Sequence, residues 1–274
     1  MSVDTASADA IKPRPAAIVS RRKFEPPYAL ITLIILIALW QLACLGGVPA
    51  FLLPAPYDIA KDLFSHAAYF VPHAWATMLV VIIGFVASVA VGLPLAIALS
   101  YSRILNKSLY ALIVGSQVVP KVAIAPLMLA WFGFGLTPKI AIVIAIAFFP
   151  VVINSVVGLR STPPQMIYLA HSMGANLWQI FWRFCLPQAL PSILAGMKMA
   201  AVLAVIGAVV GEFVGADAGL GYIILTASSN FDITRQFSAI ILLSALGMIF
   251  FWLIEALEQK VIPWHVSIRA ERRA

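Results

Sequence analysis

A single lysine stands within a long apolar run, between two prolines. Residues 119–126 read Val-Pro-Lys-Val-Ala-Ile-Ala-Pro, with Lys121 as the only charge. Proline kinks a helix by removing a hydrogen bond, and a lysine that faces lipid is costly. We therefore expect Lys121 to face a bundle interior, a cavity or an interface. There its ammonium would attract an anionic or polar solute on a translocation pathway. The alternative is a structural role, in which Lys121 neutralises the carbonyls at a helix end or extends its ammonium to the membrane surface.

Two carboxylates, Glu212 and Asp217, lie in a glycine-rich segment farther along the chain. Glycine recurs there every four residues, at Gly207, Gly211, Gly215 and Gly219. Small residues at this spacing let helices approach closely, either within one chain or across a dimer. The two acidic side chains are candidates for a gate or for a contact with a partner protein, and a solvated acidic loop is the alternative.

The sequence contains no pattern typical of catalysis or of metal binding. Cys44 and Cys185 lie far apart, and the four histidines lack the spacing of metal ligands. There is no GxxxxGK[ST] phosphate loop, no HExxH and no Ser/His/Asp arrangement. We therefore expect that this chain is not an enzyme and binds no cofactor or metal.

Composition places the chain in a membrane. Of its 274 residues 62% are hydrophobic and 11% charged, and the mean hydropathy is +1.00. Six apolar runs approach the length of about 20 residues that spans a bilayer, at residues 28–45, 78–100, 109–132, 140–157, 193–210 and 237–257. Backbone groups cannot stay unpaired in lipid, so the runs must be helical. We predict an all-α, polytopic membrane protein with six transmembrane helices in a domain at 28–257, with tails at 1–27 and 258–274.

The distribution of lysine and arginine predicts the orientation. With the N-terminus in the cytoplasm, thirteen of these residues lie inside and only Lys61, Lys139 and Arg235 outside. Both termini are therefore expected in the cytoplasm, and the first span is expected to be a retained signal anchor. The formal charge of +7 follows from this topology, so nucleic-acid binding is not needed to explain it.

The longest cytoplasmic segment is predicted to form two short helices. Ser161 or Thr162 can cap the first, which has prolines in its first turn. Gly174 suits the left-handed conformation that ends this helix. Asn176 can cap the second helix, and Pro187 would stop it.

Both helices of this loop, residues 158–191, are amphipathic. The apolar face of the first consists of Met166, Leu169, Ala170 and Met173, and that of the second of Leu177, Ile180, Phe181 and Phe184. Two such faces can insert into a groove of a partner protein. Alternatively, they lie along the membrane interface or pack on the spans of the same chain.

The loop resembles the EAA loop of bacterial ABC-importer permeases. That pattern reads E-A-A, three residues, glycine, nine residues and I-x-L-P, and this sequence matches it at Ala170, Gly174, Leu186 and Pro187. It departs from the pattern at Tyr168, Leu169 and Phe184. Because Tyr168 replaces the acidic residue, no charged contact is expected at that position.

The resemblance extends over residues 50–257 and includes the segments LPAP, VPK, APL, WFG and GEF. These are similar to segments in permeases of sulfonate, taurine and nitrate importers, and of importers of pyrimidine precursors or riboflavin. The resemblance implies the type I importer permease fold in a bacterial inner membrane. It also implies a second permease copy, ATPase subunits that hold ATP and Mg²⁺, and a periplasmic or lipid-anchored solute-binding protein.

In this family the loop docks into the ATPase subunit and transmits its closure to the spans. The resemblance therefore implies coupling contacts at Tyr168, Leu169, Ala170, Gly174, Leu177, Phe181, Leu186 and Pro187. It leaves Lys121, Glu212 and Asp217 as pathway or gate candidates. Two rival hypotheses are a secondary transporter driven by an ion gradient and a membrane scaffold that does not transport.

Overall fold

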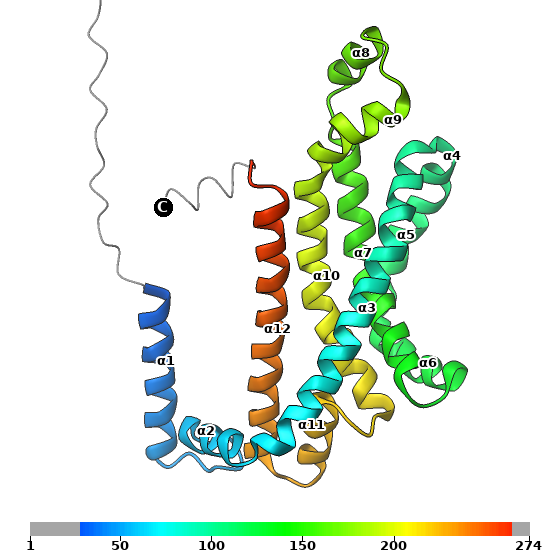
Figure 1. Cartoon of the computed structure of the whole chain (residues 1–274). Helices are drawn as coiled ribbons and strands as arrows, with labels where there is room; N and C mark the ends of the chain where they lie inside the picture. Colours follow the sequence, from blue (N-terminus) through cyan, green and yellow to red (C-terminus); the bar gives the residue numbers. More distant parts are fainter. Residues whose placement is uncertain (1–27, 265–274) are drawn as a thin grey trace, which may run out of the picture.

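The computed structural model describes residues 28–264, and every regular element in this range is a helix (Figure 1). Four helices are long and apolar enough to cross a membrane. They are α3 (Ala67–Tyr101), α7 (Leu136–Arg160), α10 (Leu186–Gly215) and α12 (Ile233–Val261). Helix α7 packs against both α3 and α10, and α12 packs on α10. The tail at 1–27 and the last ten residues of the tail at 258–274 lie outside the described range.

The expectation of six membrane-crossing helices is not confirmed for the described residues. The run predicted at 109–132 forms two apolar segments, Arg103–Val118 and Lys121–Phe132, which meet at 90°. Counting this pair as one span raises the number of crossing helices to five. The first run forms α1 (Tyr28–Leu45), whose stretch Leu30–Leu45 falls in the class of shorter apolar helices.

Proline chemistry explains why the third run breaks instead of kinking. Pro120 offers no N–H and disfavours a helical conformation in the residue before it. Val119 and Pro120 are accordingly extended, with ψ of 124° and 100°. The resulting elements are α4 (Arg103–Leu105), a π-turn (Asn106–Tyr110), α5 (Ala111–Gly115), 3₁₀ turns at Ser116–Val118 and Lys121–Ile124, and α6 (Ala125–Phe132).

Short helices cover the two ends of the bundle (Figure 1). Helices α2 (Pro56–Ser65) and α11 (Leu220–Ser229) lie at one end, and α8 (Pro164–Ser172) and α9 (Leu177–Ile180) at the other. Helix α1 runs away from the α8–α9 end and α12 runs back toward it. Both ends of the described range therefore point to the side of α8 and α9.

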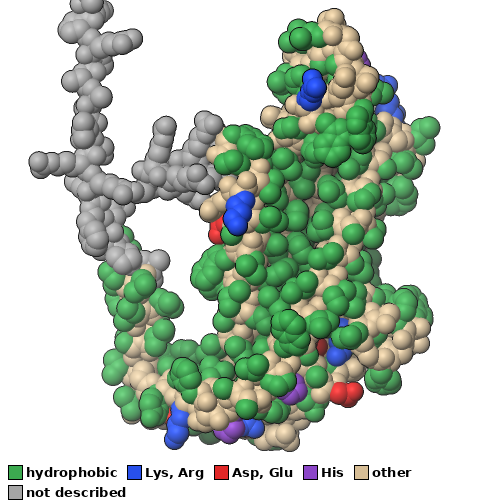
Figure 2. Space-filling view, viewed as in Figure 1, with side chains coloured by type: hydrophobic (Ala, Val, Ile, Leu, Met, Phe, Trp, Pro, Cys, Tyr) green, Lys and Arg blue, Asp and Glu red, His purple; other side chains and the backbone are tan. Residues whose placement is uncertain are grey.

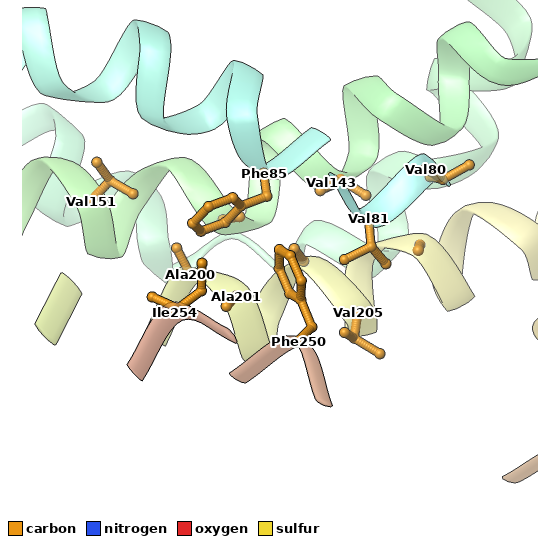
Figure 3. Close-up of a cluster of buried hydrophobic side chains, with 13 residues drawn as sticks. Val80, Val81, Phe85, Val143, Val151, Ala200, Ala201, Val205, Phe250 and Ile254 are labelled. Carbon is orange, nitrogen blue, oxygen red and sulfur yellow. The ribbon is translucent and has the colours of Figure 1, made fainter. Parts of the chain in front are cut away.

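Small side chains allow the central helices to pack closely. A Cβ on Gly207 would lie 2.9 Å from the Cα of Val143, and a Cβ on Gly84 would overlap the side chain of Val143. The core between these helices is built from valine, alanine and phenylalanine side chains (Figure 3). Phe85 of α3 meets Phe250 of α12 edge to face, with ring centroids 5.2 Å apart.

The glycine stripe packs within this chain. Gly207 and Gly211 face α7, Gly215 faces Leu129 of α6, and Gly219 faces Glu212. The stripe therefore brings α10 against its own neighbours, as the first of the two sequence interpretations expects.

The flank of the bundle is covered by apolar side chains, and the charged side chains gather toward its two ends (Figure 2). Exposed leucine and isoleucine side chains surround α1 in particular. Such a surface suits a hydrocarbon environment.

Candidate functional site

The first cytoplasmic helix begins differently from the prediction. Pro163 occupies the N-cap of α8 and Pro164 its first position, without a side-chain cap. The expected capping by Ser161 or Thr162 is therefore wrong, whereas the proline in the first turn is confirmed. The hydroxyl of Ser161 instead donates to the carbonyl of Gly158 at 2.7 Å, at the end of α7.

The turn between α8 and α9 has the predicted stereochemistry. Gly174 has a φ of 79°, in the left-handed region that glycine adopts without a steric penalty. Asn176 Oδ1 accepts the N–H of Gln179 at 2.8 Å, and Gln179 Oε1 accepts the N–H of Asn176 at 3.0 Å. This reciprocal pair is a capping box. Both predictions for this turn are confirmed.

The prediction that Pro187 ends the second helix is wrong. The chain is helical without interruption from Leu177 to Gly215, over 39 residues. A π-turn at Phe181–Cys185 precedes the proline, and the N–H of Leu186 bonds the carbonyl of Phe181, five residues earlier. The wider turn accommodates the ring of Pro187 and its missing N–H, so the helix continues.

The predicted coupling residues differ in their exposure, and Leu186 and Pro187 are half-buried whereas Gly174 is exposed. Ala170 and Phe181 are buried, together with Ile180, against α7 and α10 in the chain's own core. Tyr168, Leu169 and Leu177 are exposed, and their exposed fractions are 71%, 63% and 68%.

The face predicted for the second helix is therefore directed mainly inward. Ile180 and Phe181 pack on the chain itself, as the alternative interpretation expects. The exposed aromatic side chains are Trp178 and Trp182, which the sequence reasoning missed. Their separation by four residues on one helix face was the available signal.

Two hollows flank the second helix. One, of about 340 Å³, lies between α8 and α9 and is lined by Ala170, Met173, Gly174, Ala175, Gln179, Arg183 and Phe184. The other, of about 460 Å³, is lined by Leu93, Ile97, Tyr101, Leu177, Trp178, Phe181, Trp182 and Leu186. The larger hollow is thus apolar and aromatic, whereas Gln179 and Arg183 give the smaller one a polar side.

Lys121 lies at the break in the third run. Its Nζ donates to the carbonyl of Gln117 at 3.3 Å and stands 4.7 Å from the ring centroid of Phe149. This contact agrees with the second alternative given above, in which Lys121 neutralises the carbonyls at a helix end. The same side chain also lines a hollow of about 380 Å³.

Glu212 is only 1% exposed and binds the start of α11. Its Oε1 accepts from the hydroxyl of Thr77 at 2.8 Å, and its Oε2 accepts from the N–H of Gly221 at 2.7 Å. A solvated loop is therefore the wrong interpretation for Glu212. Asp217, by contrast, is exposed, so the structure separates the two carboxylates that the sequence grouped.

The hydrogen bonds around Glu212 join α3 to the start of α11, two distant parts of the chain. The N–H of Leu220 donates to Thr77 Oγ1 at 2.8 Å, and the N–H of Gly219 donates to His73 Nδ1 at 3.0 Å. Thr77 and His73 were missed by sequence reasoning. The available signal was the pair of polar residues just before the apolar run predicted at 78–100.

A second charged contact joins α10 to α12. Lys198 Nζ lies 2.5 Å from Glu258 Oε2, and the two side chains are 25% and 11% exposed. Lys198 lies within the apolar run predicted at 193–210, and nothing in the sequence indicated its partner.

Comparison with known proteins decides the family. Residues 88–263 match the family of binding-protein-dependent transport system inner membrane components. The chain belongs to this family. It is a permease subunit of an ATP-binding-cassette transporter and an integral protein of the inner membrane, and EAA loops are typical of such permeases. These subunits have no ATPase site of their own.

Two relatives match almost over their full lengths. The chain is 34% identical to the formylaminopyrimidine transport permease ThiX of Halalkalibacterium halodurans, over 89% of this chain and 98% of the relative. It is 35% identical to the riboflavin transport system permease RibX of Chloroflexus aurantiacus, over 90% and 94%. The taurine permease TauC of Escherichia coli is 28% identical, over 86% and 88%.

The fold is that of a solved permease chain. An inward-facing structure of the MetNI methionine ABC transporter aligns with a TM-score of 0.63 at 21% identity, over 72% of this chain and 98% of that chain. The family relationship and this fold support the type I importer permease class that the sequence predicted.

Proposed function

We propose that this permease imports a small organic solute and is driven by a separate ATPase that docks on residues 158–191. In this proposal the α8–α9 end and both termini lie in the cytoplasm. Two permease copies enclose the pathway, and a solute-binding protein delivers the solute from outside. ATP and Mg²⁺ are held by the ATPase.

One observation carries the docking assignment: the hairpin of α8 and α9 lies at one end of the bundle (Figure 1) and exposes apolar side chains. The helix from Leu177 to Gly215 has 39 residues, which corresponds to roughly 58 Å. A hydrocarbon core is only about 30 Å thick. In this proposal the additional length of the helix lies on the side of the hairpin and places Tyr168, Leu169 and Leu177 in water. A cluster of exposed apolar side chains there supports a protein partner.

The packing of the hairpin makes it able to transmit a displacement. Ala170 and Phe181 are anchored in a core that also contains Leu159 of α7 and Ile193 of α10. The α9 helix continues into α10 without a loop. A movement of the hairpin caused by ATP-driven closure of the ATPase would therefore move α7 and α10, and hydrolysis would reverse it.

The relatives indicate the size of the solute. The names of the three relatives described above give their solutes as formylaminopyrimidine, riboflavin and taurine, which are all small organic molecules. We infer a solute of this kind for the present permease.

The docking assignment is tested with the full complex. Leu169→Glu places a charge in an exposed apolar contact without disturbing the core, and we expect loss of ATPase co-purification and of ATP-dependent uptake. The matched control is Phe64→Glu, because Phe64 is an exposed apolar residue of α2 at the opposite end. Normal co-purification and uptake in Leu169→Glu would refute the docking surface.

The same preparations separate the rival hypotheses. Uptake by the wild-type protein that persists without ATP would favour a secondary transporter. Unchanged uptake in a strain that lacks the gene would favour a scaffold.

A further inference from the structure

The lysines at membrane depth differ in their acidic neighbours. Lys198 pairs with Glu258 at 2.5 Å. Among residues 28–264, neither Lys121 nor Lys139 has a carboxylate within 4.0 Å. Lys139 lies at the beginning of α7, whereas Lys121 lies at the break in the third apolar run. An unpaired charge inside a membrane protein is costly and is found mainly at functional positions.

The ring beneath Lys121 lies near the middle of the bundle. Phe149 is near the centre of α7 (Leu136–Arg160). A Cβ on Gly207 would meet Val143, and a Cβ on Gly196 would meet the carbonyl of Pro150. This part of α7 therefore lies beside the middle of α10, which places the Lys121 ammonium at membrane depth.

Lys121 is one of the residues that line a hollow of a suitable size for a small molecule. The hollow measures about 380 Å³ and is lined by Val91, Ser116, Val119, Lys121, Ile124, Ile144, Ala145, Phe148 and Phe149. Small-molecule sites are mostly apolar cavities of roughly 300–1,000 Å³ with a few polar groups that fix orientation. Irregular backbone at membrane depth, as at Val119 and Pro120, is tolerated where it lines a cavity.

Only one side chain in this lining is free to donate hydrogen bonds to a ligand. The hydroxyl of Ser116 already donates to the carbonyl of Ile113 at 2.8 Å. The Lys121 ammonium has three donors, and its contact with the Gln117 carbonyl uses one of them. The remaining lining is aliphatic or aromatic.

We propose that this hollow, which we name the Lys121 hollow, holds the solute during transit, and that the solute is an organic anion. Its apolar or aromatic body would lie against Phe148 and Phe149, and its acidic group would bind the Lys121 ammonium. A small hydrated inorganic anion is not expected, because the lining would not replace its water. The inference rests on the importer function proposed above and narrows its solute class.

The test uses two probes of the same shape, benzenesulfonate and the neutral benzenesulfonamide, with sodium sulfate as the inorganic anion. Binding is measured by calorimetry and by ligand-induced thermal stabilisation of the full-length chain in detergent. We expect the wild-type protein to bind benzenesulfonate more tightly than either of the other two. Equal binding of the sulfonamide, preference for sulfate, or no binding of benzenesulfonate would overturn the proposal.

Three substitutions and one control locate the site. Lys121→Met should weaken benzenesulfonate binding by roughly ten- to a hundredfold, the loss expected for hydrogen bonds to a charged group, and Lys121→Arg should retain most of it. Ala145→Phe fills the hollow and should abolish binding while leaving the lysine in place. Lys107→Met removes an exposed cation elsewhere and should change nothing. Unchanged binding in both Lys121→Met and Ala145→Phe would refute the site.

The outcome is separable from that of the importer proposal. Probe binding is measured on the permease itself, whereas the importer proposal fails if no ATPase co-purifies with the wild-type protein. If the wild-type protein co-purifies with an ATPase but does not prefer benzenesulfonate to the other two probes, the anion site alone is refuted.

Discussion

Replacing Glu212 by glutamine and by alanine should affect the stability of this permease very differently. Glu212 accepts two hydrogen bonds in a buried position, from Thr77 and from the N–H of Gly221 at the start of α11. Hydrogen bonds to a charged group are each worth about 1.5–3 kcal/mol. Glu212→Ala removes both and should therefore destabilise the protein by about 3–6 kcal/mol.

Glutamine can replace most of these contacts. Its Oε1 can accept the N–H of Gly221, and its Nε2 can donate to Thr77 Oγ1 if the threonine proton turns to the carbonyl of His73, which is 3.2 Å away. What is lost is the charge at the N-terminus of α11, worth about 0.3–1 kcal/mol and up to ~2 kcal/mol when partly buried. Glu212→Gln should therefore cost about 1–2 kcal/mol.

The assay is thermal unfolding of the detergent-purified protein. At about 2–4 °C per kcal/mol for chains of 150–250 residues, Glu212→Ala should lower Tm on the order of 10 °C and Glu212→Gln by a few degrees. The losses of stability caused by Thr77→Val and Glu212→Ala should be less than additive in the double variant, because both substitutions remove the same contact. Asp217→Asn is the control, since Asp217 is exposed. Equal Tm values for the alanine and glutamine variants would refute the network.

Two further predictions concern a charge pair and a turn. Lys198→Met alone should destabilise the protein by up to about 3 kcal/mol, because it leaves Glu258 unpaired in a mostly buried site. The double variant Lys198→Met/Glu258→Leu should recover most of this loss. Thermal unfolding measures both variants, and a double variant less stable than the single one would contradict the pairing. Gly174→Ala should lower the stability of the protein by about 1–2 kcal/mol, because Gly174 has a φ of 79°. The control Gly115→Ala should be neutral or stabilising, because Gly115 has an ordinary helical conformation and open space around it. Equal effects of the two variants on thermal unfolding would argue against the left-handed turn.

Features that depend on a few adjacent residues could be predicted from the sequence. The four long spans, the left-handed Gly174 and the Asn176 cap follow from apolar length and from local backbone stereochemistry. The prolines around Lys121 predicted a distortion, although its size, a 90° break, depends on how α6 packs against α7.

The continuation of the helix through Pro187 could not be predicted from proline chemistry alone. Proline in a helix interior ordinarily breaks it, and here the π-turn at Phe181–Cys185 absorbs the missing hydrogen bond. The burial of Ile180 and Phe181 in the core beside Ile193 fixes the path of the chain at this point. That burial also determines which face of the hairpin remains for a partner.

By itself, the sequence determined that the chain is helical and membrane-embedded, and that it turns at Gly174 before a helix capped by Asn176. These properties follow from apolar content and from the limited conformations of glycine, proline and asparagine. Only the tertiary structure decided which polar side chains meet. Glu212 and Thr77 are 135 residues apart in the chain, and Lys198 finds Glu258 on another helix. Such pairings depend on helix packing, because side chains distant in sequence meet only when the whole bundle has formed.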